Sequence, residues 1–282
     1  MATVKARFCG RGNALSFWPH RTVIAVLFLL WLHPALYAGS EAAANPAATS
    51  PANASSQNRG RQTDFLFDRP KGFIGFRFGR LFPRADSEVF DMITDQLTLE
   101  KSDFHAIDFG IDGGFDLQER VDLIFSFDYA KTTVDSEFRD YEDERGLPIT
   151  QTTSLEQLPL TGGVKFLILP RGRKIGSFSW IPNRVVPFVG AGAGVLWYRL
   201  EQKGDFVDFE TYEIFSARLE SNGWTPTAYA GGGADINIAK GLFLTLDLRY
   251  FWAETRLKRD FVGFDKIDLA GLRATAGLQW HF

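Results

Sequence analysis

The chain has 282 residues, of which 45% are hydrophobic and 15% aromatic, and its formal net charge at pH 7 is -3. A protein that binds nucleic acid presents a basic surface, so this charge argues against a nucleic-acid partner. Cys9 is the only cysteine, which leaves the rest of the chain without disulfides or thiolate metal sites.

The first 38 residues have the features of a cleaved secretory signal peptide. Four basic residues precede an apolar run over 22–32, and no acidic residue occurs before Glu41. The run is shorter than the roughly 20 residues that a membrane-spanning helix needs, and the small residues Ala38 and Gly39 follow it. We therefore expect residues 1–38 to direct export and to be removed, with an uncleaved anchor as the alternative. Loss of this leader takes the net charge from -3 to -7.

Residues 39–62 are rich in Ala, Ser, Asn and Pro and contain almost no large apolar side chain. Such a segment cannot bury enough surface to offset the entropy of ordering it, so we expect a flexible periplasmic linker. Residues 63–282 then form a single all-β domain.

Eight segments of this domain alternate apolar and polar residues with a period of two, which places one residue class on each face of a β-strand. In the last segment Leu278 and Trp280 share one face, while Gln279 and His281 share the other. At about ten residues, each segment is long enough to cross a bilayer when tilted. The eight segments are 72–82, 105–117, 121–129, 157–169, 187–198, 227–238, 242–252 and 271–282.

The connections between these segments alternate in length. Transmembrane barrels have long extracellular loops and short periplasmic turns, so the alternation predicts both chain ends in the periplasm. The turn over 170–186 is an exception, because it is longer than its periplasmic position predicts. The long polar connections are 83–103, 132–152, 201–226 and 253–266, and the tight ones are 118–120 and 239–241.

The alternation does not by itself decide which face points outward, because a soluble lipocalin-like barrel also has about eight strands around an apolar interior. The polar face of the segments is dense in glycine, as a narrow lumen requires, and aromatic residues gather at the segment ends as interfacial girdles do. We therefore predict a transmembrane antiparallel up-and-down β-barrel of about eight strands with its apolar face toward lipid. The girdle residues are Tyr129, Trp197, Tyr250, Trp252, Trp280 and Phe282.

Two motifs resemble those of small outer-membrane barrels. The segment 276–282, Ala-Gly-Leu-Gln-Trp-His-Phe, resembles the C-terminal signature by which such barrels are recognised for insertion. The segment 186–194, Val-Pro-Phe-Val-Gly-Ala-Gly-Ala-Gly, resembles a strand of the OmpW-like family, and 231–250 resembles that family's later strands. The resemblance implies the outer membrane as location, outer-membrane lipid and lipopolysaccharide as surroundings, and the barrel-assembly machinery as a partner that would bind Leu278, Trp280 and Phe282.

If the apolar face points to lipid, nine charged side chains point into the lumen, where each must be paired or hydrated. We interpret them as an ion-pair network that plugs the lumen, and the alternative is an ion-pair gate over a narrow pore. The nine residues are Arg77, Asp108, Asp112, Asp128, Lys165, Asp235, Asp247, Arg249 and Arg273.

Near the predicted extracellular rim the inward face becomes apolar. The family resemblance implies a funnel for small hydrophobic solutes there, whereas a one-residue slip in phase would place the same side chains in the outer girdle. The predicted funnel residues are Leu81, Phe104, Leu196, Tyr198, Tyr229, Phe251, Ile267 and Leu269.

Catalysis is not expected. Beyond the leader the chain has only His105 and His281, which lie at opposite ends of the predicted barrel and cannot act together. No metal ion or cofactor is expected either. The functional prediction is passive passage of small hydrophobic solutes, and the alternative is a structural or surface-binding barrel of the adhesin or receptor type with a plugged lumen.

Overall fold

The computed structural model describes residues 69–143, 145–175, 179–208, 211 and 213–282. The predicted signal peptide over 1–38 and the predicted linker over 39–62 lie outside the described residues, so these two predictions stay as they are. Among the described helices, none has the length and apolar character needed to cross a membrane.

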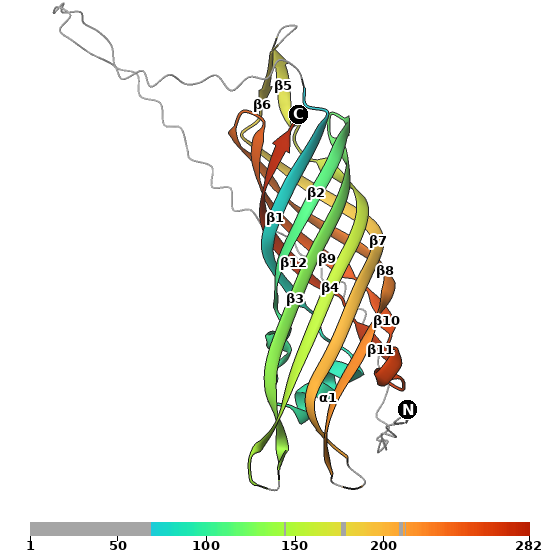
Figure 1. Ribbon diagram of the computed structural model, residues 1–282. Coiled ribbons are helices and arrows are strands. Elements are labelled where there is room, and N and C mark those ends of the chain that lie inside the picture. The colour runs from blue at the N-terminus through green and yellow to red at the C-terminus, as the bar shows by residue number, and fades with distance from the viewer. Residues whose placement is uncertain (1–68, 144, 176–178, 209–210, 212) are drawn as a thin grey trace, which may run out of the picture. The chain divides into compact units, whose positions relative to one another are not determined.

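Eight long antiparallel strands close into a barrel, in the order β1-β12-β9-β8-β7-β4-β3-β2 (Figure 1). Each strand pairs with its neighbour along the chain, and β12 pairs with β1 to complete the ring, so the predicted fold class is confirmed. The eight strands are β1 (Gly72–Pro83), β2 (Ala106–Gln118), β3 (Val121–Glu142), β4 (Pro148–Leu167), β7 (Val185–Val207), β8 (Ile214–Ala239), β9 (Leu242–Trp252) and β12 (Gly271–His281).

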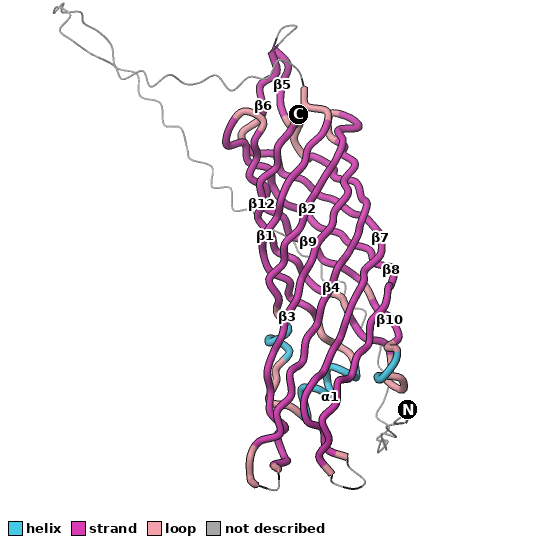
Figure 2. Tube along the Cα trace, in the orientation of Figure 1, coloured by secondary structure: helices cyan, strands magenta, loops and turns pink. Residues whose placement is uncertain are grey.

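The remaining elements are short and lie at the two ends of the barrel (Figure 2). One end, here named the C-terminal end, carries the C-terminus and a hairpin of β5 (Gly172–Ile175) and β6 (Ser179–Pro182) (Figure 1). The other end, here named the α1 end, carries five elements. These are α1 (Glu88–Gln96), η1 (Lys101–Phe104), β10 (Glu254–Arg256), η2 (Arg259–Phe261) and β11 (Lys266–Asp268).

Four strands are about twice as long as predicted. β3, β4, β7 and β8 have 20 to 26 residues, against 11 to 13 for the other four. The prediction of polar loops over 132–152 and 201–226 is therefore wrong, because most of both segments continues the strands. Side chains still alternate between the two faces there, but the outward ones are polar. The sequence-based prediction ended each strand where its outward residues stopped being apolar.

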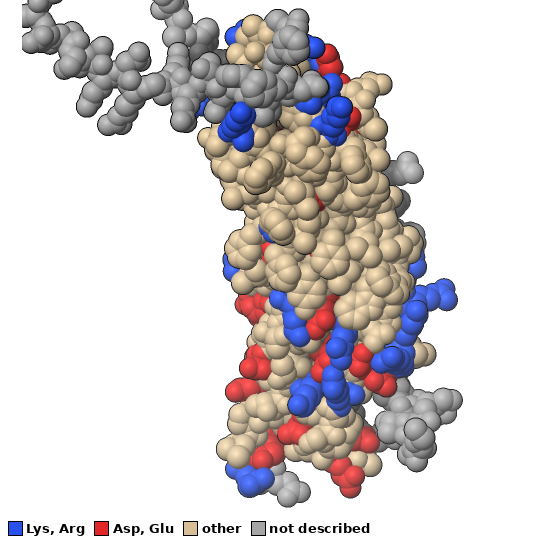
Figure 3. Space-filling view, turned by 45° about the horizontal axis from the view of Figure 1, so that its top comes forward, with Lys and Arg blue, Asp and Glu red and all other residues tan. Residues whose placement is uncertain are grey.

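The outer surface changes character along single strands. On β3 the outward side chains of Phe127 and Tyr129 are followed by Lys131, and on β7 Trp197 is followed by Arg199. Figure 3 shows the result as a broad uncharged belt with charged residues beyond each border. Large apolar side chains are half or more exposed within this belt, such as Phe76 at 65% and Phe125 at 52%. A barrel in water would hide these side chains, so the belt faces lipid and the barrel is transmembrane.

The interior changes in the opposite sense. Inward residues are charged along the height of the apolar belt and apolar at the α1 end, where 19 buried residues form one hydrophobic cluster. Over one part of its height the barrel is apolar outside and charged inside, as in a membrane. Over the other part it is charged outside and apolar inside, as in a water-soluble protein.

Candidate functional site: the closed lumen

All nine predicted lumen charges lie inside the barrel, each at most 5% exposed, and each takes part in an ion pair. They are arranged in layers along the barrel, because inward residues of neighbouring strands fall at the same height.

The central layer is built around Arg77 of β1. Its Nε lies 2.7 Å from Asp112 Oδ2, and its Nη2 donates to Asp128 Oδ1 at 2.5 Å. A third carboxylate, Asp247, lies 3.8 Å from Nη1. A guanidinium can serve three carboxylates in this way because it presents five N–H donors in one plane.

Arg249 of β9 completes the central layer. It donates two hydrogen bonds to Asp247 Oδ2, at 2.9 and 2.7 Å, and a third to the Ser126 hydroxyl at 2.9 Å. Ser126 in turn donates to Asp112 at 2.6 Å. The two arginines and their partners from β2, β3 and β9 therefore form one connected network across the lumen.

A smaller pair lies on each side of this layer. Toward the C-terminal end, Lys165 Nζ lies 2.6 Å from Asp235 Oδ2 and 3.8 Å from the centre of the Phe188 ring. Toward the α1 end, Arg273 pairs with Asp108 and also donates to Gln157 at 3.3 Å. Burial of single charges costs several kcal/mol, so this pairing is what permits so many ions in one interior.

The sequence-based set omitted one layer, at the mouth of the C-terminal end. Arg171, only 2% exposed, contacts Asp116 at 2.7 Å and Asp122 at 2.5 Å. Arg171 lies between β4 and β5, in the turn whose unusual length was the one exception to the predicted alternation. That length and the basic residues of the turn were the available signal, because a turn that inserts a side chain into the lumen needs extra residues to do so.

Little space is left between these layers. A cavity of about 10 Å³ lies among Lys165, Phe188, Tyr229 and Arg249, which is room for about one water molecule. At this height the barrel is packed with side chains and holds no channel.

Two aromatic rings cover the central layer on its α1 side. Tyr229 and Phe251 stack with their centroids 5.3 Å apart, and the guanidinium of Arg249 lies 5.2 Å from the centre of the Tyr229 ring. Gly163 and Gly192 give the tyrosine its room, because a Cβ on either would lie within 2.5 Å of the Tyr229 side chain. The glycines predicted for the inward face of a narrow lumen here make room for one aromatic side chain, that of Tyr229.

The predicted funnel residues all point inward and are at most 5% exposed: Leu81, Phe104, Leu196, Tyr198, Tyr229, Phe251, Ile267 and Leu269. The alternative of a phase slip into the outer girdle is therefore wrong. The eight side chains do not surround an open space, however. Phe104, Leu196, Tyr198, Ile267 and Leu269 pack in the hydrophobic cluster of the α1 end.

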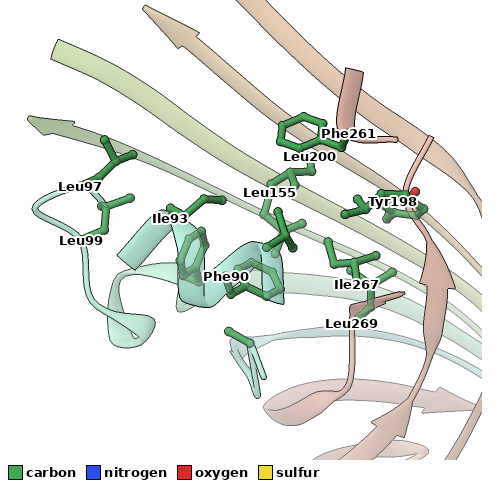
Figure 4. Packing of buried hydrophobic residues seen from close by; sticks show 14 of the residues in the cluster. Phe90, Ile93, Leu97, Leu99, Leu155, Tyr198, Leu200, Phe261, Ile267 and Leu269 are labelled. Atoms are coloured by element: carbon green, nitrogen blue, oxygen red, sulfur yellow. The ribbon is translucent and has the colours of Figure 1, made fainter. Parts of the chain in front are cut away.

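Helix α1 supplies the centre of that cluster. Val89, Phe90 and Ile93 are at most 1% exposed, and Figure 4 shows α1 facing Leu155 and Leu200 of the barrel wall. Spacing of one and four residues places the three apolar side chains on one helix face. The segment had been predicted as part of a polar loop over 83–103, because nine residues are too few for helical periodicity to stand out.

Contacts from β3 hold the segment that follows α1. Arg139 Nε donates to the Leu97 carbonyl at 2.8 Å, and the Thr98 amide donates to the Glu137 carbonyl at 2.9 Å. The extended part of β3 thus supports α1 from the side, and we refer to α1 with its cluster as the apolar plug.

The remaining predicted residues lie as follows. Leu278, Trp280 and Phe282 face outward at 50%, 65% and 67% exposure, and their role as an insertion signal stays a prediction. His105 packs on Phe82 at the α1 end, whereas His281 lies at the C-terminal end. Within the described residues no group of three or more His, Cys, Asp or Glu could hold a metal ion. The absence of enzymatic activity stays a prediction.

No family model matches the sequence, and no curated protein matches it either. Among solved structures, the chain is similar to Ail, the attachment invasion locus protein of Yersinia pestis, at 12% identity and a TM-score of 0.42, over 76% of this chain and 100% of Ail. It is similar to the outer membrane protein OprG of Pseudomonas aeruginosa at 12% identity and a TM-score of 0.41, over 77% and 99% of the two chains. The N-terminal β-barrel domain of OprF from the same organism matches at 13% identity and a TM-score of 0.32, over 76% and 100%.

The conclusion about architecture comes from the chain's own geometry. The ring of eight strands, the lipid-facing belt and the filled interior together show that the chain is a small transmembrane β-barrel, the architecture of small outer-membrane proteins.

Proposed function

We propose that the chain is an outer-membrane barrel with a closed lumen, whose extracellular part is a binding surface. The observation that carries this proposal is the position of the apolar plug, which lies over the ion-pair layers inside the barrel. The α1 end is extracellular in this proposal, since long connections are typical of that side.

Passage through the lumen requires two unlike obstacles to be removed together. An apolar solute would have to displace α1 and then cross layers of paired ions in which it gains no favourable contact. A polar solute or ion would meet the apolar plug first. A close-packed interior resists the displacement of its side chains, because opening a cavity in it costs several kcal/mol.

The extended strands supply the surface. β3, β4, β7 and β8 continue as a four-stranded sheet beyond the closed ring, and its turns expose apolar side chains. Leu147 is 54% exposed at one turn and Phe215 is 43% exposed at the other, where it stacks on Phe206 at 6.0 Å. Exposed aromatic and apolar groups on a rigid support are typical of surfaces that bind other macromolecules.

Passive passage of small hydrophobic solutes is the second candidate. The observation in its favour is that Tyr229 and Phe251 do face inward, so a path past them would have an apolar lining if α1 were displaced. The two candidates differ in whether α1 leaves the barrel in the working protein.

Flux through liposomes that contain the purified barrel tests the proposal. We expect the wild-type protein to pass neither a fluorescent apolar solute nor a small sugar, and Phe90→Asp with Ile93→Asp to leave sugar flux at the wild-type level, because the ion-pair layers still close the lumen when the plug is disrupted. Solute passage by the wild-type barrel that Tyr229→Arg and Phe251→Arg abolish, in folded protein, would replace the proposal with the second candidate.

The binding surface has its own test. Cells that display the barrel are compared with cells that carry Leu147→Ser and Phe215→Ser, for attachment to immobilised host-cell and bacterial surface material. We expect attachment to fall with the double variant and to persist with Ser216→Ala, an exposed substitution on the same turn. Equal attachment by all three, at matched surface expression, would remove the binding surface from the proposal. Lipopolysaccharide and the barrel-assembly machinery are the further partners that we propose.

A further inference from the structure

Basic residues occupy every turn of the C-terminal end. All six are exposed, and they come from the chain before β1, from each of the connections between strands, and from the hairpin of β5 and β6. We name this set the basic collar, and Figure 3, with this end tilted forward, shows basic side chains beyond the border of the uncharged belt. The collar consists of Lys71, Arg120, Arg173, Lys174, Arg184 and Lys240.

Five of the six collar residues are not neutralised by any described carboxylate. Among the described residues no carboxylate lies within salt-bridge distance of Lys71, Arg120, Arg173, Lys174 or Arg184. Three acidic residues occur in the same turns, but Asp116 and Asp122 point into the lumen and are bound by Arg171. Of these three acidic residues only Glu119 has an exposed side chain.

The α1 end differs in this respect. Several of its exposed basic residues have a carboxylate partner, as in Lys131 with Glu156 at 2.7 Å and Arg218 with Glu201 at 2.9 Å. Most exposed basic residues of the α1 end are paired in this way, whereas none of the five collar residues named above has a described carboxylate partner.

Exposed apolar side chains lie beside the collar residues. Leu117 is 59% exposed three positions before Arg120, Val185 is 46% exposed next to Arg184, and Ile238 is 50% exposed two positions before Lys240. The Lys71 amide also donates to the Phe282 carbonyl at 2.7 Å, which places Lys71 beside a residue that is 67% exposed.

This combination is specific to a membrane border. Apolar side chains at that level enter the acyl region, while long basic side chains reach to the phosphate layer above it. A soluble anionic polymer would be bound by the charges but would leave the apolar neighbours exposed to water. An anionic phospholipid satisfies both groups at once.

We propose that the basic collar binds the phosphate groups of anionic phospholipids in the leaflet at the C-terminal end. The collar then selects these lipids as the first shell around the barrel and fixes the depth of this end in the membrane. This inference does not depend on whether the lumen is closed, so its test is separate from that of the proposed function.

The test uses the purified barrel in vesicles of phosphatidylcholine and phosphatidylglycerol at a ratio of three to one. After mild detergent extraction, native mass spectrometry measures the two lipids that stay bound. Each basic residue near a charged surface favours anionic lipid by about fivefold, so we expect phosphatidylglycerol to be enriched at least about fivefold over the mixture.

Two variants with the same change in charge separate local binding from bulk attraction. The collar variant carries Lys71→Gln, Arg120→Gln, Arg173→Gln and Arg184→Gln. The control carries Arg80→Gln, Lys203→Gln, Arg256→Gln and Lys258→Gln at the α1 end, all exposed positions. We expect the enrichment to disappear in the collar variant and to persist in the control, with both variants folded by their heat-dependent mobility in gels.

Three outcomes would overturn the proposal: no enrichment in the wild-type protein, full enrichment in the collar variant, or equal loss in both variants. Isolated peptidoglycan provides the competing arm. If it retains the wild-type barrel but not the collar variant, while the lipids show no preference, the collar binds a polymer and the lipid proposal is wrong.

Discussion

Arg77 reaches Asp128 across an intervening strand. The two residues lie on β1 and β3, and the residue of β2 that stands in register between them is Gly110. Because this glycine has no side chain, the guanidinium can donate to Asp128 Oδ1 at 2.5 Å over the β2 backbone. A Cβ at Gly110 would lie 2.1 Å from that same oxygen, so the ion pair depends on the glycine.

Substitution of that glycine is therefore the first prediction. Gly110→Ala should displace Asp128 and destabilise the barrel by about 1–3 kcal/mol, as overpacking of a filled interior does. Gly113→Ala on the same strand is the control, because its Cβ would meet no atom closer than 3.9 Å. Urea unfolding in lipid vesicles, followed by fluorescence, measures both. Equal stability of the two variants would contradict the account of Gly110.

Removal of the arginine itself should cost more. Arg77→Leu leaves Asp128 buried without its ion-pair partner and takes one of two arginines from Asp112, and loss of one member of a buried network costs about 3–5 kcal/mol. Arg80→Leu, an exposed position on the same strand, should change the free energy of unfolding by less than about 0.5 kcal/mol. If Arg77→Leu unfolds at the wild-type urea concentration, the network contributes little to stability.

The membrane border can be located by labelling. Single cysteines at Phe125 and Thr133 face outward on β3, on opposite sides of the change at Lys131. In reconstituted barrel with Cys9 replaced, a water-soluble maleimide should label the cysteine at 133 at least tenfold faster than the one at 125. Leu246→Cys on β9 should be protected like position 125. Rapid labelling of positions 125 and 246 would show that the apolar belt is in water.

The turn between β3 and β4 should respond to acid. The amides of Leu147 and Arg145 each donate to Asp143 Oδ1 at 2.8 Å. The bond from Leu147 is the main reason that the pKa of Asp143 lies below its usual value of 3.8. A carboxyl with a lowered pKa stabilises the folded turn above 3.8 and loses that effect as the pH falls through the lower value.

The chemical shift of the Leu147 amide proton in NMR spectra follows this titration. We expect its midpoint to lie below pH 3.8 and to vanish in Asp143→Asn, which keeps an acceptor oxygen but has no proton to gain. Asp140→Asn, a nearby exposed substitution, should leave the midpoint unchanged. A midpoint at or above the ordinary value would show that the two amide bonds do not favour the charged form.

The sequence alone determined the ring of strands and the direction of their faces. Period-two alternation is a local property. It predicts the faces correctly because a strand places successive side chains on opposite sides regardless of its partners. Phe125 and Leu246 were assigned outward, and Asp112 and Arg249 inward, for this reason. The alternation misled only beyond Lys131 and Arg199, where the outward face changes from apolar to polar. A polar outward face is equally typical of a strand in water and of a loop.

Only the tertiary structure decided what fills the barrel. Whether Tyr198 and Ile267 line a funnel or pack a core depends on α1, a nine-residue helix from a different part of the chain. The pairing of Arg171 with Asp122 likewise depends on how a turn folds back into the lumen. Contacts of this kind join residues about 50 to 180 positions apart, and no local pattern encodes which of several inward side chains will meet. The faces of a barrel follow from the order of its residues, whereas the occupancy of its interior follows from three-dimensional packing.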